Sequence, residues 1–160
     1  MSFIVVSNST PIIALAKIGR IDMLRELFGI IVIPEAVYNE VSDEGRKRAG
    51  SAEVAAYDWI ITKKVDNRTA VDFLLVSVDI GEAEAIVLAK ETEASLLLID
   101  DRAGRRMSES VGLALTGTIG LLLRYYRGSP SSFKLSLDEL VANGFRIGKA
   151  EYQNIIKLAK

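Results

Sequence analysis

The sequence predicts an α/β fold, a three-layer α/β/α arrangement around a central and mostly parallel sheet. Strand-like and helix-like segments alternate along the chain without an internal repeat, as they do where crossover helices join neighbouring strands. The apolar run at 95–99 stops abruptly at Asp100 and Asp101. A buried central strand ends in this way at the edge of a parallel sheet, where such folds bind their ligands.

The composition is typical of one globular domain covering residues 1–160. The chain is 49% hydrophobic and 26% charged, which supplies enough apolar side chains for a core. It has no basic leader, and no apolar run approaches the roughly 20 residues that span a bilayer, so we expect a cytoplasmic protein with no membrane contact. The net charge is -1, so nucleic-acid binding would need a local basic patch.

The individual elements follow from hydrophobic periodicity and capping residues. Strands are expected at 3–6, 30–33, 59–62, 95–99 and 114–116, the last at a sheet edge. Caps and a proline between Ser7 and Pro11 begin a helix that Gly19 ends. Other helices are expected at 21–28, 34–41, 69–77, 81–92, 105–111 and 119–126, with a polar, exposed stretch at 42–50. Two closing helices, 135–143 and 150–159, account for the C-terminal part at 135–160.

The chain contains no histidine and no cysteine. Their absence excludes the usual zinc sites, a Ser-His-Asp relay and a cysteine nucleophile. Carboxylate chemistry remains, with Mg²⁺ or Mn²⁺ bound through oxygen as the expected cofactor.

Five polar residues are expected at the carboxyl edge of the sheet. Asn8 follows the first strand, and Asp100 and Asp101 end the strand at 95–99. Glu40 and Glu82 lie on helices, each near a face that should pack inward. A carboxylate in such a position is costly unless it is paired or binds a metal.

Each acid also has a structural interpretation. Asp79 and Glu82 have the spacing of a capping box, Asp100 or Asp101 can cap the following helix, and Glu40 can be a solvated helix residue. Glu84 lies about 200° around the helix from Glu82, so the two cannot face one site.

Two basic groups are candidates for nucleic-acid binding. Arg102, Arg105 and Arg106 follow the acid pair, and a second group follows the Glu40 helix, consisting of Arg46, Lys47 and Arg48. Ser9 and Thr10 add hydroxyls close to Asn8. The alternative is that the basic residues belong to solvated surfaces and that the hydroxyls cap helices.

Four segments, taken together, resemble the successive acidic motifs of the PIN domain and occur in the same order. They are 8–13, 34–40, 81–89 and 97–101. The closing segment, 137–147, is similar to a poorly characterised VapC-related branch of the PIN superfamily found in archaea and bacteria. The resemblance covers essentially the whole chain.

This resemblance implies a PIN-like fold and a Mg²⁺- or Mn²⁺-dependent ribonuclease that hydrolyses phosphodiester bonds of single-stranded RNA. Such proteins are often toxins held by a cognate antitoxin, and a homodimer is implied. By position, Asn8, Glu40, Glu82 and Asp100 would be the catalytic and metal-binding residues. Asp101 is the rival for the last place, because strand alternation allows only one of the two aspartates to point with Leu98.

Asn8 departs from the family pattern, which usually has aspartate at this position. A neutral amide oxygen binds a cation more weakly than a carboxylate does. The alternative to the ribonuclease is therefore a degenerate PIN fold that binds nucleic acid or a protein partner without cleavage.

Overall fold

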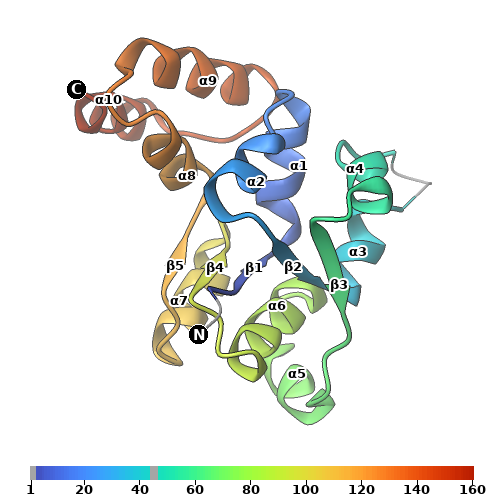
Figure 1. Ribbon diagram of the computed structural model, residues 1–160. Helices are drawn as coiled ribbons and strands as arrows, with labels where there is room; N and C mark the ends of the chain where they lie inside the picture. The colour runs from blue at the N-terminus through green and yellow to red at the C-terminus, as the bar shows by residue number, and fades with distance from the viewer. Residues whose placement is uncertain (1–2, 44–46) are drawn as a thin grey trace.

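The computed structural model describes residues 3–43 and 47–160. It contains a five-stranded sheet in the order β3-β2-β1-β4-β5, and all four neighbouring pairs are parallel (Figure 1). The strands are β1 (Val5–Ser7), β2 (Ile31–Pro34), β3 (Ile60–Lys63), β4 (Leu96–Leu98) and β5 (Leu115–Thr116). The predicted three-layer α/β/α fold is confirmed, with a sheet that is entirely parallel in the described residues.

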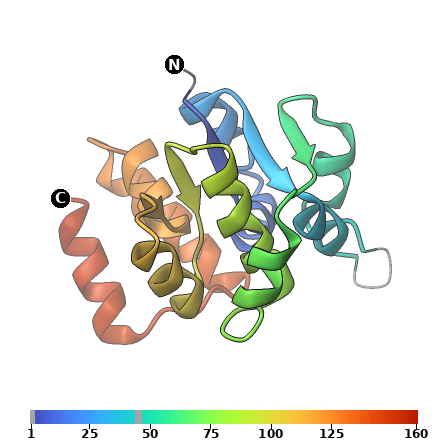
Figure 2. The ribbon, with the colours of Figure 1, turned by 90° about the horizontal axis from the view of Figure 1, so that it is seen from below.

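Helices cover both faces of the sheet (Figures 1 and 2). One layer contains α1 (Ser9–Lys17), α2 (Asp22–Phe28), α8 (Thr118–Tyr125), α9 (Pro130–Ala142) and α10 (Lys149–Leu158). On the β3 side it is continued by α3 (Glu35–Val41) and α4 (Ser51–Ala56). The other layer contains α5 (Arg68–Leu74), α6 (Ile80–Glu91) and α7 (Arg102–Ser110).

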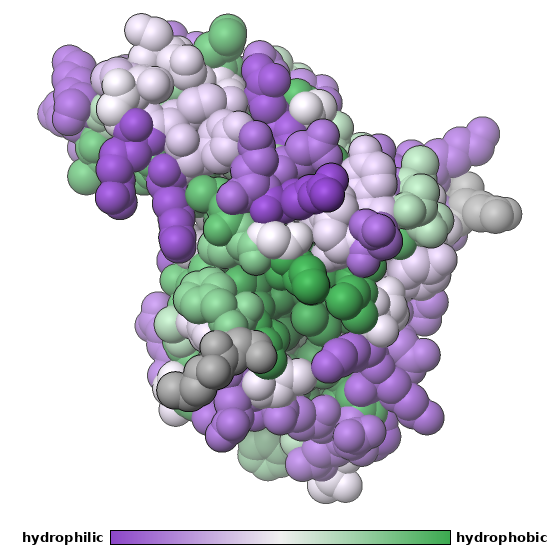
Figure 3. Space-filling model, viewed as in Figure 1, coloured by the Kyte–Doolittle hydropathy of each residue, from purple (hydrophilic) through white to green (hydrophobic). Residues whose placement is uncertain are grey.

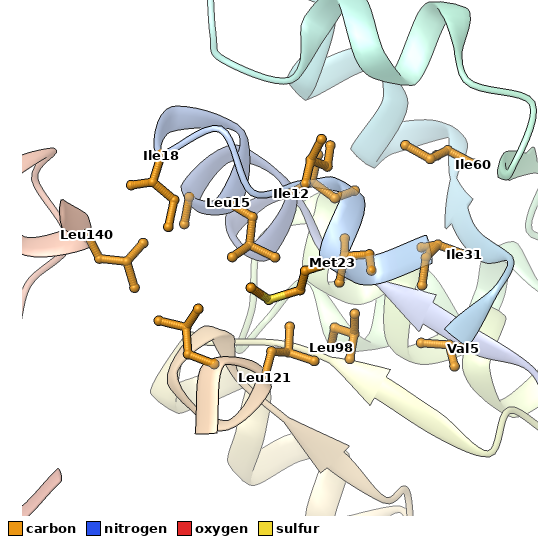
Figure 4. Close-up of a cluster of buried hydrophobic side chains, with 14 of the residues drawn as sticks. Val5, Ile12, Leu15, Ile18, Met23, Ile31, Ile60, Leu98, Leu121 and Leu140 are labelled. Carbon is orange, nitrogen blue, oxygen red and sulfur yellow. The ribbon is translucent and has the colours of Figure 1, made fainter. Parts of the chain in front are cut away.

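Side chains of the central strands alternate between two cores, one under each helical layer. Val5 and Leu98 belong to the core under α1 and α8 (Figure 4). Val6 and Leu97 belong to the core under α6. Because successive residues of a strand face opposite sides of the sheet, this alternation also sets the direction of the polar residues that follow each strand.

Several element boundaries differ from the sequence prediction. The short helix α4 was not expected, since its alanine-rich sequence buries only Val54 and so has no clear apolar periodicity. α9 begins at Pro130 rather than at 135, because Pro130 occupies its first turn. α7 begins at Arg102 rather than at 105, because the Asp101 side chain caps it.

The site edge of the sheet lies between β1 and β4. From β1 the chain continues to β2 and β3 on one side, and then returns to β4 on the other side. In parallel sheets this reversal opens a crevice at the carboxyl ends of the two strands, where ligands bind. Asn8 and Asp100 follow these two strand ends.

The surface also carries an apolar area, which Figure 3 shows in the middle of the face viewed. Phe3 and Ile30, which precede β1 and β2, are 58% and 52% exposed. Phe3 stacks on Phe28 with ring centroids 6.4 Å apart. Within 3–43 and 47–160, no helix has the length and apolar character needed to cross a membrane.

Candidate functional site

Strand alternation separates the polar residues at the sheet edge into two directions. Leu98 faces the α8 layer and Ile99 faces the α6 layer, so Asp100 is directed toward α8 and Asp101 toward α6. By the same alternation Asn8 is directed toward α6. The Asn8 backbone N–H donates to the Leu98 carbonyl at 2.9 Å, which holds it against β4.

Three side-chain oxygens converge beside Gly81, in the first turn of α6. A Cβ atom placed on Gly81 would lie 3.1 Å from Glu40 Oε2, 3.4 Å from Asn8 Oδ1 and 3.6 Å from Asp79 Oδ1. Glycine leaves this space open, because any other residue would place a methyl or methylene group there. The structure thus brings Asn8 and Glu40 together, as the sequence predicts.

Asn8 is 3% exposed, and its Oδ1 atom is buried without a hydrogen-bond donor. Its side chain does not cap α1, although its backbone is at the N-cap position. A buried amide oxygen without a partner costs about 1–3 kcal/mol. A bound cation or a hydrogen-bond donor beside this oxygen would remove that cost, and a cation would also offset the charges of the two neighbouring carboxylates.

Glu40 is held by two neighbouring side chains. Ser9 Oγ donates to Glu40 Oε2 at 2.9 Å, and Arg48 Nη1 lies 3.5 Å from Glu40 Oε1. Ser9 is 4% exposed, so its hydroxyl orients Glu40 and does not face solvent. Arg48 partly neutralises Glu40, and its buried Nε has no acceptor.

Glu82 is a buried carboxyl group with a strongly raised pKa. It is 7% exposed, and burial raises its pKa to about 7, with further increases from the negative charges of Asp79 and Asp101 and a partly opposing backbone hydrogen bond from Asp79. The Glu82 N–H donates to Asp79 Oδ1 at 2.8 Å, so Asp79 caps α6. The capping interpretation of this pair is therefore correct. The Glu82 carboxylate is nevertheless repelled by the carboxylates of Asp79 and Asp101.

Glu84 faces away from Glu82 and is fully paired. Its Oε2 accepts from Arg68 Nη1 at 2.6 Å, and its Oε1 accepts from the Ala36 N–H at 2.9 Å. It thereby joins α6 to α5 and to the N-terminus of α3. Two buried glutamates on one helix therefore differ in that Glu84 has a cationic partner and Glu82 has none described.

Asp100 and Asp101 have different surroundings. Asp101 Oδ2 accepts from the Gly104 N–H at 3.0 Å and caps α7, and Glu82 Oε2 lies 3.5 Å from the place of a Gly104 Cβ. Asp100 accepts from the Thr118 N–H at 2.8 Å and from Thr118 Oγ1 at 2.6 Å. Burial raises the pKa of Asp100, while Thr118 and the charge of Arg105 oppose the increase.

The acids therefore lie along a line rather than around one point. Asn8, Glu40 and Asp79 surround Gly81, Glu82 and Asp101 meet near Gly104, and Asp100 lies at the N-terminus of α8. In the part of the chain that the structure describes, no three acids are close enough together to form a metal site alone. The groups able to hold a hard cation are therefore oxygens of mixed type, with the Asn8 amide beside carboxylates.

A cavity of about 890 Å³ borders this line of acids. Its charged lining consists of Asp100, Asp101, Arg102, Arg105, Arg106, Glu109, Arg146 and Glu151. Thr10 also lines it and is exposed. Arg105 Nη1 is within 3.4 Å of the Ile99 carbonyl, whereas Arg102 and Arg106 are exposed.

The described part of the second basic group lies outside the cavity of about 890 Å³. Lys47 is exposed and lines a hollow beside α4 with Arg48, and Arg48 is turned toward Glu40. Arg46, also predicted to bind nucleic acid, lies outside the described residues.

Three residues at the site were not predicted from the sequence as functional. Asp79 was interpreted only as a helix cap, and its position two residues before the Gly81-Glu82 pair of α6 was the available signal. Phe145 and Arg146 line the large cavity although they follow α9. Their segment was noted for its family resemblance, but no local pattern connects it to Asp100.

Comparison with protein families agrees with the fold and the order of the motifs. A family model described as PIN domain matches residues 4–160. No curated protein matches the chain. Because the model spans nearly the whole chain, the acids described above lie inside the matched region, and the protein belongs to the PIN-domain family.

Proposed function

We propose that the protein is a divalent-metal-dependent ribonuclease that hydrolyses phosphodiester bonds of single-stranded RNA. The observation that best supports this is the buried, unpartnered Oδ1 of Asn8 beside Glu40 and Asp79. Three oxygens around one open space form the type of donor set that Mg²⁺ or Mn²⁺ prefers. A bound cation would remove both the unpaired oxygen and the repulsion between the carboxylates.

The residues fit such a cation in chemical type. Asn8, Glu40 and Asp79, whose oxygens meet beside Gly81, would hold it, and Glu82 would join them, with Asp100 or Asp101 next along the line of acids. When bound, the cation supplies Lewis-acid stabilisation of a phosphate oxygen and lowers the pKa of a water molecule. Ser9 fixes the position of Glu40, and Thr118 fixes that of Asp100.

The two terminal aspartates suit different roles. Asp101 is directed toward Glu82 and adds to its negative surroundings, which supports a share in cation binding. Asp100 opens onto the large cavity with Thr118 behind it, which supports contact with the substrate or with a water molecule. Arg102, Arg105 and Arg106 on the same cavity would bind phosphates of the RNA backbone.

The toxin role, the cognate antitoxin and the homodimer rest on the family resemblance alone. Sedimentation equilibrium at two protein concentrations tests the homodimer. A monomer at both concentrations would contradict it.

Cleavage of single-stranded RNA by the purified protein tests the main proposal. We expect slow cleavage with Mn²⁺ or Mg²⁺ that EDTA abolishes. The double variant Asp100→Asn plus Glu82→Gln should be inactive, and Asp101→Asn alone shows which aspartate matters more. Cleavage that survives both EDTA and the double change would refute a metal-dependent mechanism.

A second candidate function is binding of RNA or of a protein partner without cleavage. Two observations favour it: Asn8 supplies no charge, and the described residues contain no group of three clustered acids. The same assay separates the two candidates. RNA binding without cleavage, together with no measurable Mn²⁺ affinity, would support the non-catalytic function.

A further inference from the structure

The link between α9 and α10 forms a rigid turn beside the candidate site. Gly144 has φ +96°, a conformation that favours glycine. The Gly144 N–H donates to the Val141 carbonyl at 3.1 Å, and the Phe145 N–H donates to the Leu140 carbonyl at 2.9 Å. These bonds satisfy carbonyls at the end of α9 and fix the direction of the chain that follows.

Apolar contacts hold the turn on both sides of Arg146. Phe145 and Ile147 are half-buried and pack against the core of the α1 and α8 layer. Arg146 between them is exposed. A long cationic side chain is thus presented from an anchored backbone, which reduces the conformational entropy lost when it binds a ligand.

The turn lies between two hollows. Gly144 and Phe145 line both the cavity of about 890 Å³ and a smaller one of about 170 Å³. Thr10 is also common to both, and the smaller hollow adds two cations, Lys17 and Arg48. Cationic side chains therefore lie on each side of the turn.

The charge of the larger cavity depends on the acids at the sheet edge. Four arginines line it together with four acids, Asp100, Asp101, Glu109 and Glu151. Asp100 and Asp101 already accept hydrogen bonds from the N-termini of α8 and α7, whereas Arg102, Arg106 and Arg146 are exposed. A polyanionic strand is the ligand that fits these exposed arginines, with or without a bound cation.

We propose that the turn Gly144–Arg146 is a substrate-binding element, in which Arg146 contacts a phosphate and the Phe145 ring contacts a base of single-stranded RNA. This inference rests on the proposed ribonuclease function and assigns the C-terminal turn a part in it. An aromatic face suits unpaired bases, which stack on such side chains irrespective of sequence.

The test is the affinity for a fluorescein-labelled single-stranded RNA, measured by fluorescence anisotropy in EDTA at several salt concentrations. Arg146→Ala should raise Kd about fivefold to tenfold, and should reduce the slope of log K against log salt by about 0.7, as expected for one lost phosphate contact on a single strand. Arg146→Lys should keep the slope. Arg25→Ala, an exposed arginine on α2, should match the wild type.

Phe145→Leu keeps an apolar side chain in the core and removes the ring. We expect it to raise Kd about fivefold or more without changing the salt slope. Melting temperatures and Mn²⁺ affinities of all variants should stay near wild type, because the proposed contacts are with RNA. If the turn had a purely structural role, its variants would instead lower the melting temperature.

Three results would overturn the inference: no binding of this RNA by the wild type, an unchanged Kd and salt slope in Arg146→Ala, or equal losses in Arg146→Ala and Arg25→Ala. Because affinity is measured in EDTA, it is independent of cleavage. Wild-type protein that binds RNA through Arg146 but does not cleave it would refute the ribonuclease and leave the role of the turn supported.

Discussion

Thr118 binds both carboxylate oxygens of Asp100. Its backbone N–H donates to Oδ1 at 2.8 Å and its hydroxyl donates to Oδ2 at 2.6 Å. The contact joins the end of β4 to the first residue of α8, and it places a negative charge at a helix N-terminus, where the helix dipole favours it. Thr118 is fully buried, so no water can replace its hydroxyl.

Thr118→Val should destabilise the protein. The change keeps the side-chain shape but leaves Asp100 Oδ2 without its donor, which costs about 1–3 kcal/mol at pH 7. The loss should be smaller in acid, because the Thr118 hydrogen bonds lower the pKa of Asp100 and stabilise its charged form. Chemical unfolding at pH 4 and pH 7 measures this. Thr62→Val, at an exposed position on β3, is the control, and an equal loss in both variants would contradict the prediction.

Glu82→Gln should stabilise the metal-free protein above pH 7. Between pH 4.5 and about 7 the folded protein keeps a proton on Glu82 that the unfolded chain has lost. The free energy of unfolding therefore falls as pH rises through this window, by up to about 3 kcal/mol. Glutamine removes this pH dependence, so the variant and the wild type should differ most above pH 7 and least below pH 4.5.

Glu84→Gln on the same helix is the matched control. Glu84 is also buried, but it is paired with Arg68 and bound to the Ala36 N–H. Its replacement should therefore destabilise the protein, opposite in sign to the effect at Glu82. A Glu82→Gln variant that is less stable than wild type at pH 8 would indicate that Glu82 serves only as part of the helix cap.

Mn²⁺ binding should release a proton below pH 7. A cation near Glu82 favours the charged carboxylate, while the free protein holds a proton there up to a pH of about 7. The apparent affinity should rise by up to tenfold per pH unit below 7 and level off above it. Isothermal titration at pH 6 in two buffers of different ionisation enthalpy measures the proton count. A count of zero, with affinity independent of pH, would exclude Glu82 as a ligand.

The sequence predicts the fold well because its strongest signals are local. The apolar run before Asp100, the capping aspartate before α6 and the alternation of elements all depend on near neighbours, and the structure agrees with each of them. The start of α1 was also predicted, although no side chain caps it. Short or weakly patterned elements were less predictable. α4 buries only one valine, so its sequence has no hydrophobic periodicity from which a helix could be predicted.

The candidate site was predictable only in part. Parallel strand ends meet at one edge of a sheet, so the sequence could place Asn8 and Asp100 at the same edge. The contacts of Arg48 with Glu40 and of Arg146 with the cavity depend on how distant segments pack. No local pattern encodes these contacts. The directions of the Asp100 and Asp101 side chains could not be predicted, because they depend on which face of β4 packs against α6.

Gly81→Ala tests the space between Asn8, Glu40 and Asp79. The new methyl group would lie 3.1 Å from Glu40 Oε2 and 3.4 Å from Asn8 Oδ1, where a cation would otherwise approach. At 3.1 Å the contact with Glu40, which Ser9 holds, is tight, and Glu40 must shift by a few tenths of an ångström. This strain offsets the gain in helix propensity, which is up to about 1 kcal/mol. We therefore expect a melting temperature without metal close to wild type and a Mn²⁺ affinity at least tenfold weaker. Gly148→Ala is the control, because no atom lies within 4 Å of the new carbon, and it should leave Mn²⁺ affinity unchanged. An unchanged Mn²⁺ affinity in Gly81→Ala would show that the cation binds elsewhere.

Asn8→Asp gives the most direct test of the departure from the family pattern. The new carboxylate would lie beside Glu40 and Asp79, so the metal-free protein should become less stable through repulsion. If Asn8 is a ligand, the added charge should tighten Mn²⁺ binding by about 1–2 kcal/mol, on the scale of a charge-assisted contact, and RNA cleavage should increase.

The control is Asn154→Asp, which adds the same charge at an exposed position on α10 and should change neither stability nor affinity. Isothermal titration of Mn²⁺ and thermal unfolding separate the two functions proposed for the site. In a working metal site, Asn8→Asp loses stability without metal and regains it with Mn²⁺, because binding to the folded state adds RT ln(1 + [L]/Kd). In a non-catalytic domain the loss persists with metal. The neutral Asn8 amide would then serve to avoid a further negative charge beside Glu40 and Asp79, a role that aspartate cannot fill.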